Sequence, residues 1–91
     1  MKYFAVFLHM LDPQKSQEFR PQHLAYLDEK RKEGKIFAQG RFVDGAGGLI
    51  VYKAATEEEA IQLASQDPFI VNQARKFEIH EWELGADPVF P

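Results

Sequence analysis

The chain has no cysteine among its 91 residues. A disulfide framework, a thiol nucleophile and a thiolate-bound metal are therefore all excluded. It also has no excess of positive charge, because 11 lysines and arginines stand against 14 aspartates and glutamates, which leaves a net charge of -3. With no basic tail, this balance argues against binding to nucleic acid or to an anionic membrane surface.

Long hydrophobic runs are also missing. The most apolar stretch, residues 1–11, is too short to span a bilayer. No small-residue cleavage site follows it, and Asp12-Pro13 ends it, so it does not fit a signal peptide. We interpret it as a buried strand of a cytoplasmic protein. A phosphate loop, a dinucleotide fingerprint and a serine triad motif are absent too, and we expect no cofactor.

The first half of the chain predicts a strand, a helix and a hairpin. Residues 2–10 are apolar at both even and odd positions, which is typical of a strand covered on both faces. Helical periodicity follows over residues 14–34, and we expect Pro21 to begin the main helix after a turn or a kink. Strands over 36–43 and 49–53 flank a glycine-rich turn, as in a hairpin.

The second half has clear start signals for its elements. Thr56 and Glu59 have the spacing of a capping box, and Asp67-Pro68 has the form of an N-cap followed by proline at the first helical position. The expected elements are a helix up to about Gln66, a short helix through Ala74, and a strand over 76–84.

The resulting order, β-α-β-β-α-β, predicts an α+β fold of the ferredoxin-like type, with both helices on one face of an antiparallel sheet. We assign residues 1–84 to a single domain and residues 85–91 to a C-terminal tail. Val89 and Phe90 in this tail either dock on a partner subunit or stay free. Because the helices cover one face only, we expect a homodimer or a higher oligomer, packed sheet to sheet.

Two residues stand out as candidates for catalysis. His23 lies at the border of the apolar stripe of the first helix, and Asp67 opens the short helix. If the fold brings them together, the carboxylate can fix the tautomer of the imidazole and raise its basicity. Each residue also has a structural explanation, since His23 fits a packed histidine and Asp67 fits a helix cap. One carboxylate can serve both purposes.

Cations near this pair suggest an anionic ligand. Arg20 shares a helix face with His23, and Arg41 follows Gly40 near the end of a strand. Either guanidinium can hold an oxyanion through its planar fork, although an ordinary surface ion pair is the alternative. His9 and His80 complete the set of histidines. They come from separate elements without a close His pair, so we expect no metal site.

Four short motifs, taken together and in order, resemble the YciI-like family, also called YCII-related domains. They are Arg20-Pro21-x-His23-Leu24, Gly40-x3-Asp44-Gly45-x-Gly47-Gly48-Leu49, Glu58-Glu59-Ala60 and Asp67-Pro68-Phe69.

The resemblance implies a ferredoxin-like fold assembled as a dimeric α/β barrel, with an active site around a His-Asp pair that matches His23 and Asp67. The family's helical arginine matches Arg20. One YciI-like enzyme is a dehydrochlorinase of a chlorinated hydroquinone, while most members have no assigned reaction. This chain departs from the family in carrying Arg41 where proline is usual, and His9 where the strand often ends in an acidic residue.

Two functions follow from these observations. In the first, His23 and Asp67 transfer protons in a lyase, dehydrochlorinase or isomerase reaction on a small cyclic or phenolic anion. Arg20, Arg41 and His9 would bind that substrate, and no cofactor would be needed. In the second, the same cleft belongs to a non-catalytic ligand-binding or protein-interaction module.

Overall fold

The apolar N-terminal strand lies inside a four-stranded antiparallel sheet. In the computed structural model, which describes residues 1–85, β1 (Lys2–Met10) pairs with β3 (Gly47–Ala54) on one side and with β4 (Arg75–Glu81) on the other. β2 (Ile36–Arg41) completes the order β2-β3-β1-β4. This is the ferredoxin-like arrangement that the sequence predicts, and the prediction is confirmed.

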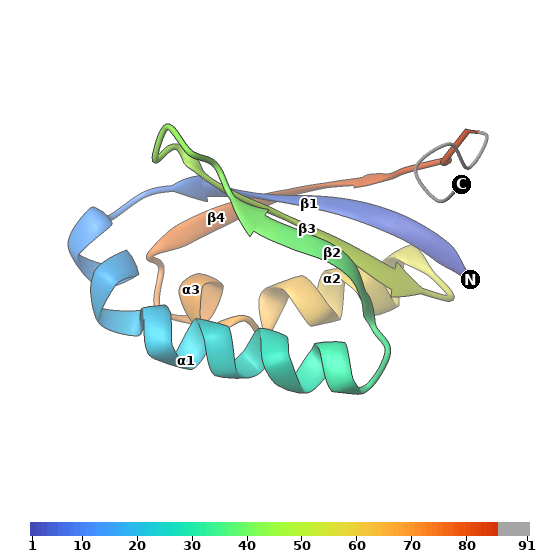
Figure 1. Ribbon diagram of the computed structural model, residues 1–91, viewed down its shortest axis with the longest axis horizontal. Coiled ribbons are helices and arrows are strands. Elements are labelled where there is room, and N and C mark those ends of the chain that lie inside the picture. The colour runs from blue at the N-terminus through green and yellow to red at the C-terminus, as the bar shows by residue number, and fades with distance from the viewer. Residues whose placement is uncertain (86–91) are drawn as a thin grey trace.

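All the helices lie on one face of this sheet (Figure 1). They are α1 (Pro13–Lys32), α2 (Glu57–Ser65) and α3 (Pro68–Val71). Strand alternation turns Phe4, Val6 and Leu8 of β1 toward the helices, where they are fully or almost fully buried. The core is therefore the layer between sheet and helices. Most side chains on the other face of the sheet are only partly covered, although Val51 is 3% exposed.

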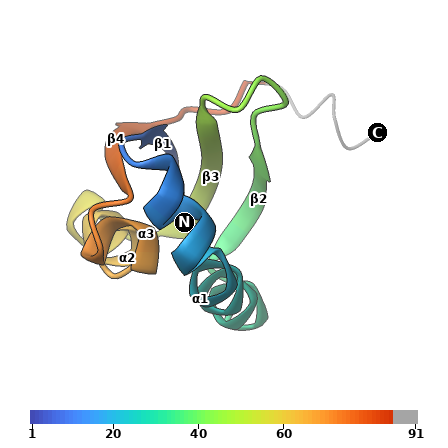
Figure 2. The ribbon, with the colours of Figure 1, turned by 90° about the vertical axis from the view of Figure 1, so that its left-hand side faces the viewer.

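Helix α1 corrects one prediction, because it begins at Pro13 rather than near Pro21. Asp12 caps it by accepting a hydrogen bond from the Lys15 amide at 3.0 Å, and Pro13 suits the first turn. Pro21 lies inside the helix, and the turns before it run at an angle to the rest in both views (Figures 1 and 2). Proline thus bends this helix instead of starting it. Gly34, with φ +79°, follows the end of the helix, where a residue in the left-handed region is common.

The hairpin and the last elements differ from prediction by a few residues. β2 stops at Arg41, and β3 already begins at Gly47. Gly47 has φ +141° and lies so close to Leu8 that a Cβ would be 1.9 Å from its carbonyl oxygen, which is why a glycine enters the sheet here. α3 ends at Val71 rather than Ala74, and β4 spans Arg75–Glu81 rather than 76–84.

The capping box at Thr56 is present in part of its predicted form, since the Thr56 hydroxyl accepts a hydrogen bond from the Glu59 amide at 3.2 Å. The predicted tail, with Val89 and Phe90, lies outside the described residues except for Gly85. Within residues 1–85, no helix is both long and apolar enough to cross a membrane.

Candidate functional site

His23 and Asp67 meet in the layer between α1 and α3. The Nδ1 atom of His23 lies 2.8 Å from Oδ1 and 3.0 Å from Oδ2 of Asp67. Both residues are buried, with 7% and 0% of their surface exposed. Because a carboxylate can only accept, Nδ1 carries the proton, and the lone pair of the neutral imidazole is at Nε2. Among the described residues, Nε2 has no hydrogen-bond partner.

Asp67 is also the N-cap of α3. Its Oδ1 accepts a hydrogen bond from the Phe69 amide at 2.9 Å, and Pro68 follows at the first helical position. The capping function and the contact with the imidazole therefore coexist on one carboxylate. The Phe69 amide and the imidazole N–H therefore both donate to this buried carboxylate.

Phe69 fixes the plane of the imidazole. Its ring lies parallel to that of His23, with centroids 3.9 Å apart and an interplanar angle of 15°. Phe69 is itself 2% exposed, so the stack is held by the core. In the sequence, Phe69 is only the third residue of the Asp67-Pro68-Phe69 motif. A large aromatic residue directly after Asp-Pro was the one sign of its importance. The sequence could not show that it contacts His23, which is 46 positions away, because that contact depends on how α1 and α3 pack.

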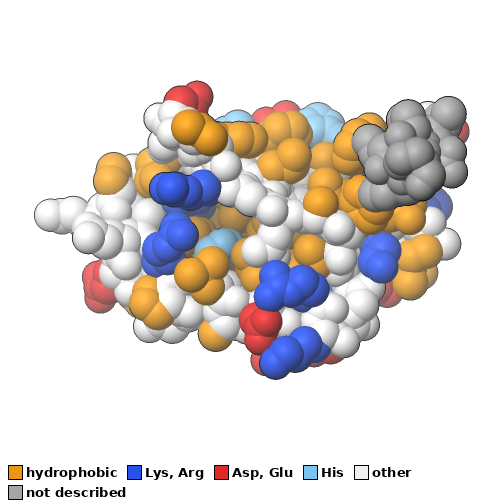
Figure 3. Space-filling model, in the orientation of Figure 1, with side chains coloured by type: hydrophobic (Ala, Val, Ile, Leu, Met, Phe, Trp, Pro, Cys, Tyr) orange, Lys and Arg blue, Asp and Glu red, His pale blue; other side chains and the backbone are white. Residues whose placement is uncertain are grey.

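A cleft opens on His23 between α1 and the edge of the sheet that β2 forms. Its volume is about 200 Å³. In the space-filling view, Lys and Arg side chains gather beside this hollow and a histidine is visible in it (Figure 3). Apolar groups line much of the cleft and polar groups its rim; the lining residues are Leu8, Arg20, His23, Leu24, Leu27, Gln39, Gly40, Arg41, Gly48, Ile50, Phe69 and Arg75.

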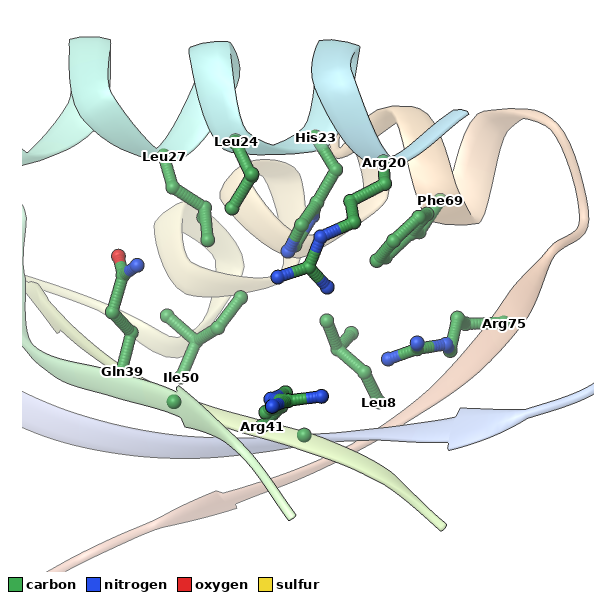
Figure 4. A pocket seen from close by; sticks show the side chains of 12 residues that line it. Leu8, Arg20, His23, Leu24, Leu27, Gln39, Arg41, Ile50, Phe69 and Arg75 are labelled. Carbon is green, nitrogen blue, oxygen red and sulfur yellow. The ribbon is translucent and has the colours of Figure 1, made fainter. Parts of the chain in front are cut away.

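Three arginines from three elements face this cleft. Arg20 comes from α1 and Arg41 from the end of β2, as the sequence leads one to expect, whereas Arg75 at the start of β4 was missed. Their guanidinium groups point toward the same space (Figure 4). The register explains Arg75, since it pairs with Met10 and so reaches the end of β1 that lies beside the start of α1. Predicting it needs the strand pairing.

Arg75 is the most constrained of the three. Its guanidinium carbon lies 4.4 Å from the centroid of the Phe69 ring, and its Nε donates a hydrogen bond to Oγ of Ser16 at 3.2 Å. Burial lowers the pKa of Arg75 from its ordinary value. The negative charge of Asp67 opposes this shift, and the positive charge of Arg20 adds to it.

Two tyrosines lie behind the His-Asp pair. Burial raises the pKa of Tyr26 to about 12, with the charge of Asp67 adding to the shift. Burial and then Asp67 also raise the pKa of Tyr52 far above its ordinary value. Both phenols are therefore protonated at neutral pH.

His9 is not brought to the cleft. Its neighbour Leu8 faces the helices, so alternation places His9 on the open face of the sheet. There its Nε2 lies 2.8 Å from Oε1 of Glu78, whose other oxygen contacts His80 at 2.5 Å. His9 was expected to line the substrate cleft, but in the structure it lies on the other face of the sheet. Among residues 1–85, no three His, Cys, Asp or Glu side chains form a cluster suited to a metal ion.

The chain belongs to the family of YCII-related domains, whose model matches residues 1–83. The resemblance drawn from the four motifs is thus confirmed. YjpA of Bacillus subtilis, a protein named as uncharacterized, is 26% identical over 83 residues, which cover 87% of this chain and 98% of that protein.

A solved structure has a similar fold. It is 5-chloro-2-hydroxyhydroquinone dehydrochlorinase from Burkholderia phenoliruptrix in complex with 2,5-dihydroxybenzoquinone. The TM-score is 0.79 at 20% identity, and the match covers 91% of this chain and 95% of that one. At this identity the likeness establishes the fold.

Proposed function

We propose that this protein is a cofactor-independent acid–base enzyme of the lyase or isomerase kind, with His23 as the proton-transfer group and Asp67 as its partner. The observation that carries the proposal is the buried His23–Asp67 contact beside an open cleft. It leaves Nε2 as the basic atom of the imidazole, and Asp67 stabilises the imidazolium that forms when Nε2 takes a proton.

The reaction would proceed as an elimination or an isomerisation on a small ring. His23 removes a proton from a carbon or hydroxyl group of the substrate, and the electron pair moves into the ring. In the elimination, a leaving group such as chloride departs with its bonding electrons, so charge and atoms balance. Arg20 and Arg41 would stabilise the oxyanion that develops on the ring.

The comparisons support this class of substrate. The structural neighbour is a dehydrochlorinase bound to a dihydroxybenzoquinone. The cleft here, at about 200 Å³, is smaller than the roughly 300–1,000 Å³ of pockets for drug-sized ligands. A cavity of about 150 Å³ is enough for benzene, so a cyclic or phenolic molecule with few substituents is of suitable size.

The test combines turnover with the state of the imidazole. Purified protein would be incubated with 5-chloro-2-hydroxyhydroquinone and related halogenated phenols, with chloride release as the readout. We expect His23→Gln and Asp67→Asn each to lower turnover by roughly 10²–10⁴-fold. Asparagine is a good N-cap, so Asp67→Asn removes the charge and keeps α3.

Nitrogen NMR of the His23 ring supplies the second readout. In the wild type the proton should be on Nδ1, and in Asp67→Asn this preference should weaken. A folded His23→Gln protein with full turnover would refute the proposal. Ligand binding without turnover of any compound in the screen would instead favour the binding module.

A further inference from the structure

The charge distribution around the cleft is uneven. The chain has four arginines, and three of them, Arg20, Arg41 and Arg75, line the same cleft. A second, more open hollow of about 450 Å³ is also lined by these three, so they stand between the His23 cleft and an outer groove. A protein with a net charge of -3 therefore concentrates its guanidinium groups at one place.

No carboxylate among residues 1–85 pairs with these guanidinium groups. Within the part of the chain that the structure describes, none of the three forms an ion pair, and Arg75 donates only to the Ser16 hydroxyl. The fourth arginine, Arg31, shows the ordinary arrangement, since its Nη2 is 2.7 Å from Oδ1 of Asp28. A surface ion pair therefore accounts for Arg31. It does not account for the three arginines of the cleft.

The arrangement is costly without an anion. Three like charges face one partly enclosed space, and the positive charge of Arg20 contributes to the lowered pKa of Arg75. Like charges that converge in this way repel each other, and an anion between them removes the repulsion. Arginine is also the side chain best suited to hold carboxylate or phosphate oxygens in a fork.

We propose that Arg20, Arg41 and Arg75 form a receptor for a dianionic group of the substrate, either a phosphate or two adjacent carboxylates. The remainder of the molecule then enters the inner cleft beside His23, and this part rests on the proposed function. The substrate class becomes a small ring with a doubly charged head group. Arg75 is the anchor, since Phe69 and Ser16 hold its guanidinium in place.

A dianion site and a general anion site can be distinguished by comparing the affinities of ligands that differ in charge. Calorimetry at pH 8 would compare phenol, benzoate, phthalate and phenyl phosphate, which share one ring and differ in charge. We expect phthalate or phenyl phosphate to bind at least tenfold more tightly than benzoate, and phenol to bind most weakly. Comparison of phthalate with phenyl phosphate distinguishes the two head groups. Equal affinity for benzoate and both dianions would overturn the proposal.

Variants locate the site. Arg41 is exposed, so Arg41→Gln should fold normally and weaken binding of the dianion by roughly ten- to hundredfold, the loss expected for one charged hydrogen bond. Arg75→Lys keeps the charge and loses the fork, and we expect a smaller loss. Arg31→Gln removes the same charge from the far end of α1 and should leave affinity unchanged. A similar loss in Arg31→Gln, or none in Arg41→Gln, would show that the arginines of the cleft are not the receptor.

The same titrations in His23→Gln separate this inference from the proposed function. Binding of the dianion that is retained in His23→Gln and weakened at least tenfold in Arg41→Gln establishes the receptor even if no reaction is ever found. Dianion binding that is unchanged in Arg41→Gln, together with turnover of phenols that depends on His23, would refute the dianion site and leave proton transfer by His23 in place.

Discussion

Asp67 concentrates several functions in one side chain. It caps α3, binds the imidazole of His23, and lies close enough to Tyr26 and Tyr52 to raise the pKa of both phenols. It does so with none of its surface exposed. A buried carboxylate is costly unless hydrogen bonds satisfy its oxygens, and here a backbone amide and an imidazole N–H do so.

The two tyrosines behind the site predict opposite stability changes. The Tyr52 hydroxyl is buried and has no hydrogen-bond partner among the described residues, whereas the Tyr26 hydroxyl donates to the Leu63 carbonyl at 2.7 Å. Tyr52→Phe should raise the free energy of unfolding by about 1 kcal/mol, and Tyr26→Phe should lower it by about 1 kcal/mol. Urea denaturation measures both. A loss in Tyr52→Phe would show that the hydroxyl has a partner.

On the open face of the sheet, Glu78 is expected to make a contribution to stability that is lost in acid. Hydrogen bonds from His80 and then from His9 lower the pKa of Glu78. The pKa of Glu78 is therefore lower in the folded than in the unfolded protein. Glu78 contributes to the free energy of unfolding at pH values above the ordinary pKa of a glutamate. This contribution is lost as pH falls through the pKa of Glu78 in the folded protein.

Glu78→Gln is the matching variant. It should be less stable than the wild type near pH 6, and the difference should disappear on acidification through the carboxyl range. Denaturation at a series of pH values measures this, with Glu83→Gln as the control. If Glu78→Gln stayed equally less stable than the wild type at low pH, the ionisation of Glu78 would not be the cause.

Helix α1 shows how one element positions two groups of the site. The bend at Pro21 lies between Arg20 and His23, and both side chains face the cleft. Proline costs one backbone hydrogen bond in a helix interior. The structure keeps it where the helix changes direction across the sheet, so the bend helps to set the angle between the arginine and the imidazole.

Two glycines of the β2–β3 hairpin, Gly47 and Gly40, should differ in how far replacement by alanine lowers stability. A Cβ on Gly47 would lie 1.9 Å from the Leu8 carbonyl oxygen at a φ of +141°, whereas a Cβ on Gly40 meets nothing within 4 Å. Gly47→Ala should lower the free energy of unfolding by about 2–4 kcal/mol through clash and backbone strain. Gly40→Ala should change it by less than about 1 kcal/mol. Equal effects in thermal or urea unfolding would rule out this account of Gly47.

At the scale of the whole molecule, the sheet has one covered face and one open face. The open face carries a groove lined by Ala5, Phe7, Leu49, His80, Glu81 and Trp82. Trp82 is 45% exposed beside Phe7 and Leu49, and a contiguous exposed apolar patch marks an interaction site. We propose that a second copy covers this face, as the sequence led us to expect.

Leu49→Asp tests the homodimer. It places a charge in the middle of the open face, and we expect it to convert a dimer into a monomer at micromolar concentration. Ile61→Asp makes the same change on the exposed side of α2 and should leave the dimer intact. Sedimentation velocity measures both. A wild-type protein that sediments as a monomer would remove the proposal.

Several features could be predicted because their causes are local. The cap at Thr56, the Asp67-Pro68 start of α3 and the glycine after α1 each depend on a few neighbouring residues. The bounds of β1 agree with the sequence for the same reason, since its apolar run ends at Asp12-Pro13. Pro21 was misjudged because its local penalty is real, yet packing of α1 on the sheet outweighs it.

The candidate site was predictable in its parts and not in its assembly. His9 was assigned to the cleft because it stands at the strand end where the family often carries an acidic residue. The apolar residues of β1 occur at both parities, so the sequence could not show that His9 is on the other face. Arg75 was overlooked because its place beside Arg20 depends on the pairing of β4 with β1. Both errors concern the relation of one element to another.

The order of the elements, their caps and the ferredoxin-like plan could be predicted from the sequence, because they follow from periodicity and from interactions over a few residues. The sequence also excluded thiol chemistry. The contact of His23 with Asp67 across 44 positions and the convergence of three arginines on one cleft are visible only in the folded chain. The reason is physical: such contacts exist only once distant elements pack, and packing depends on the shape and burial of the whole core.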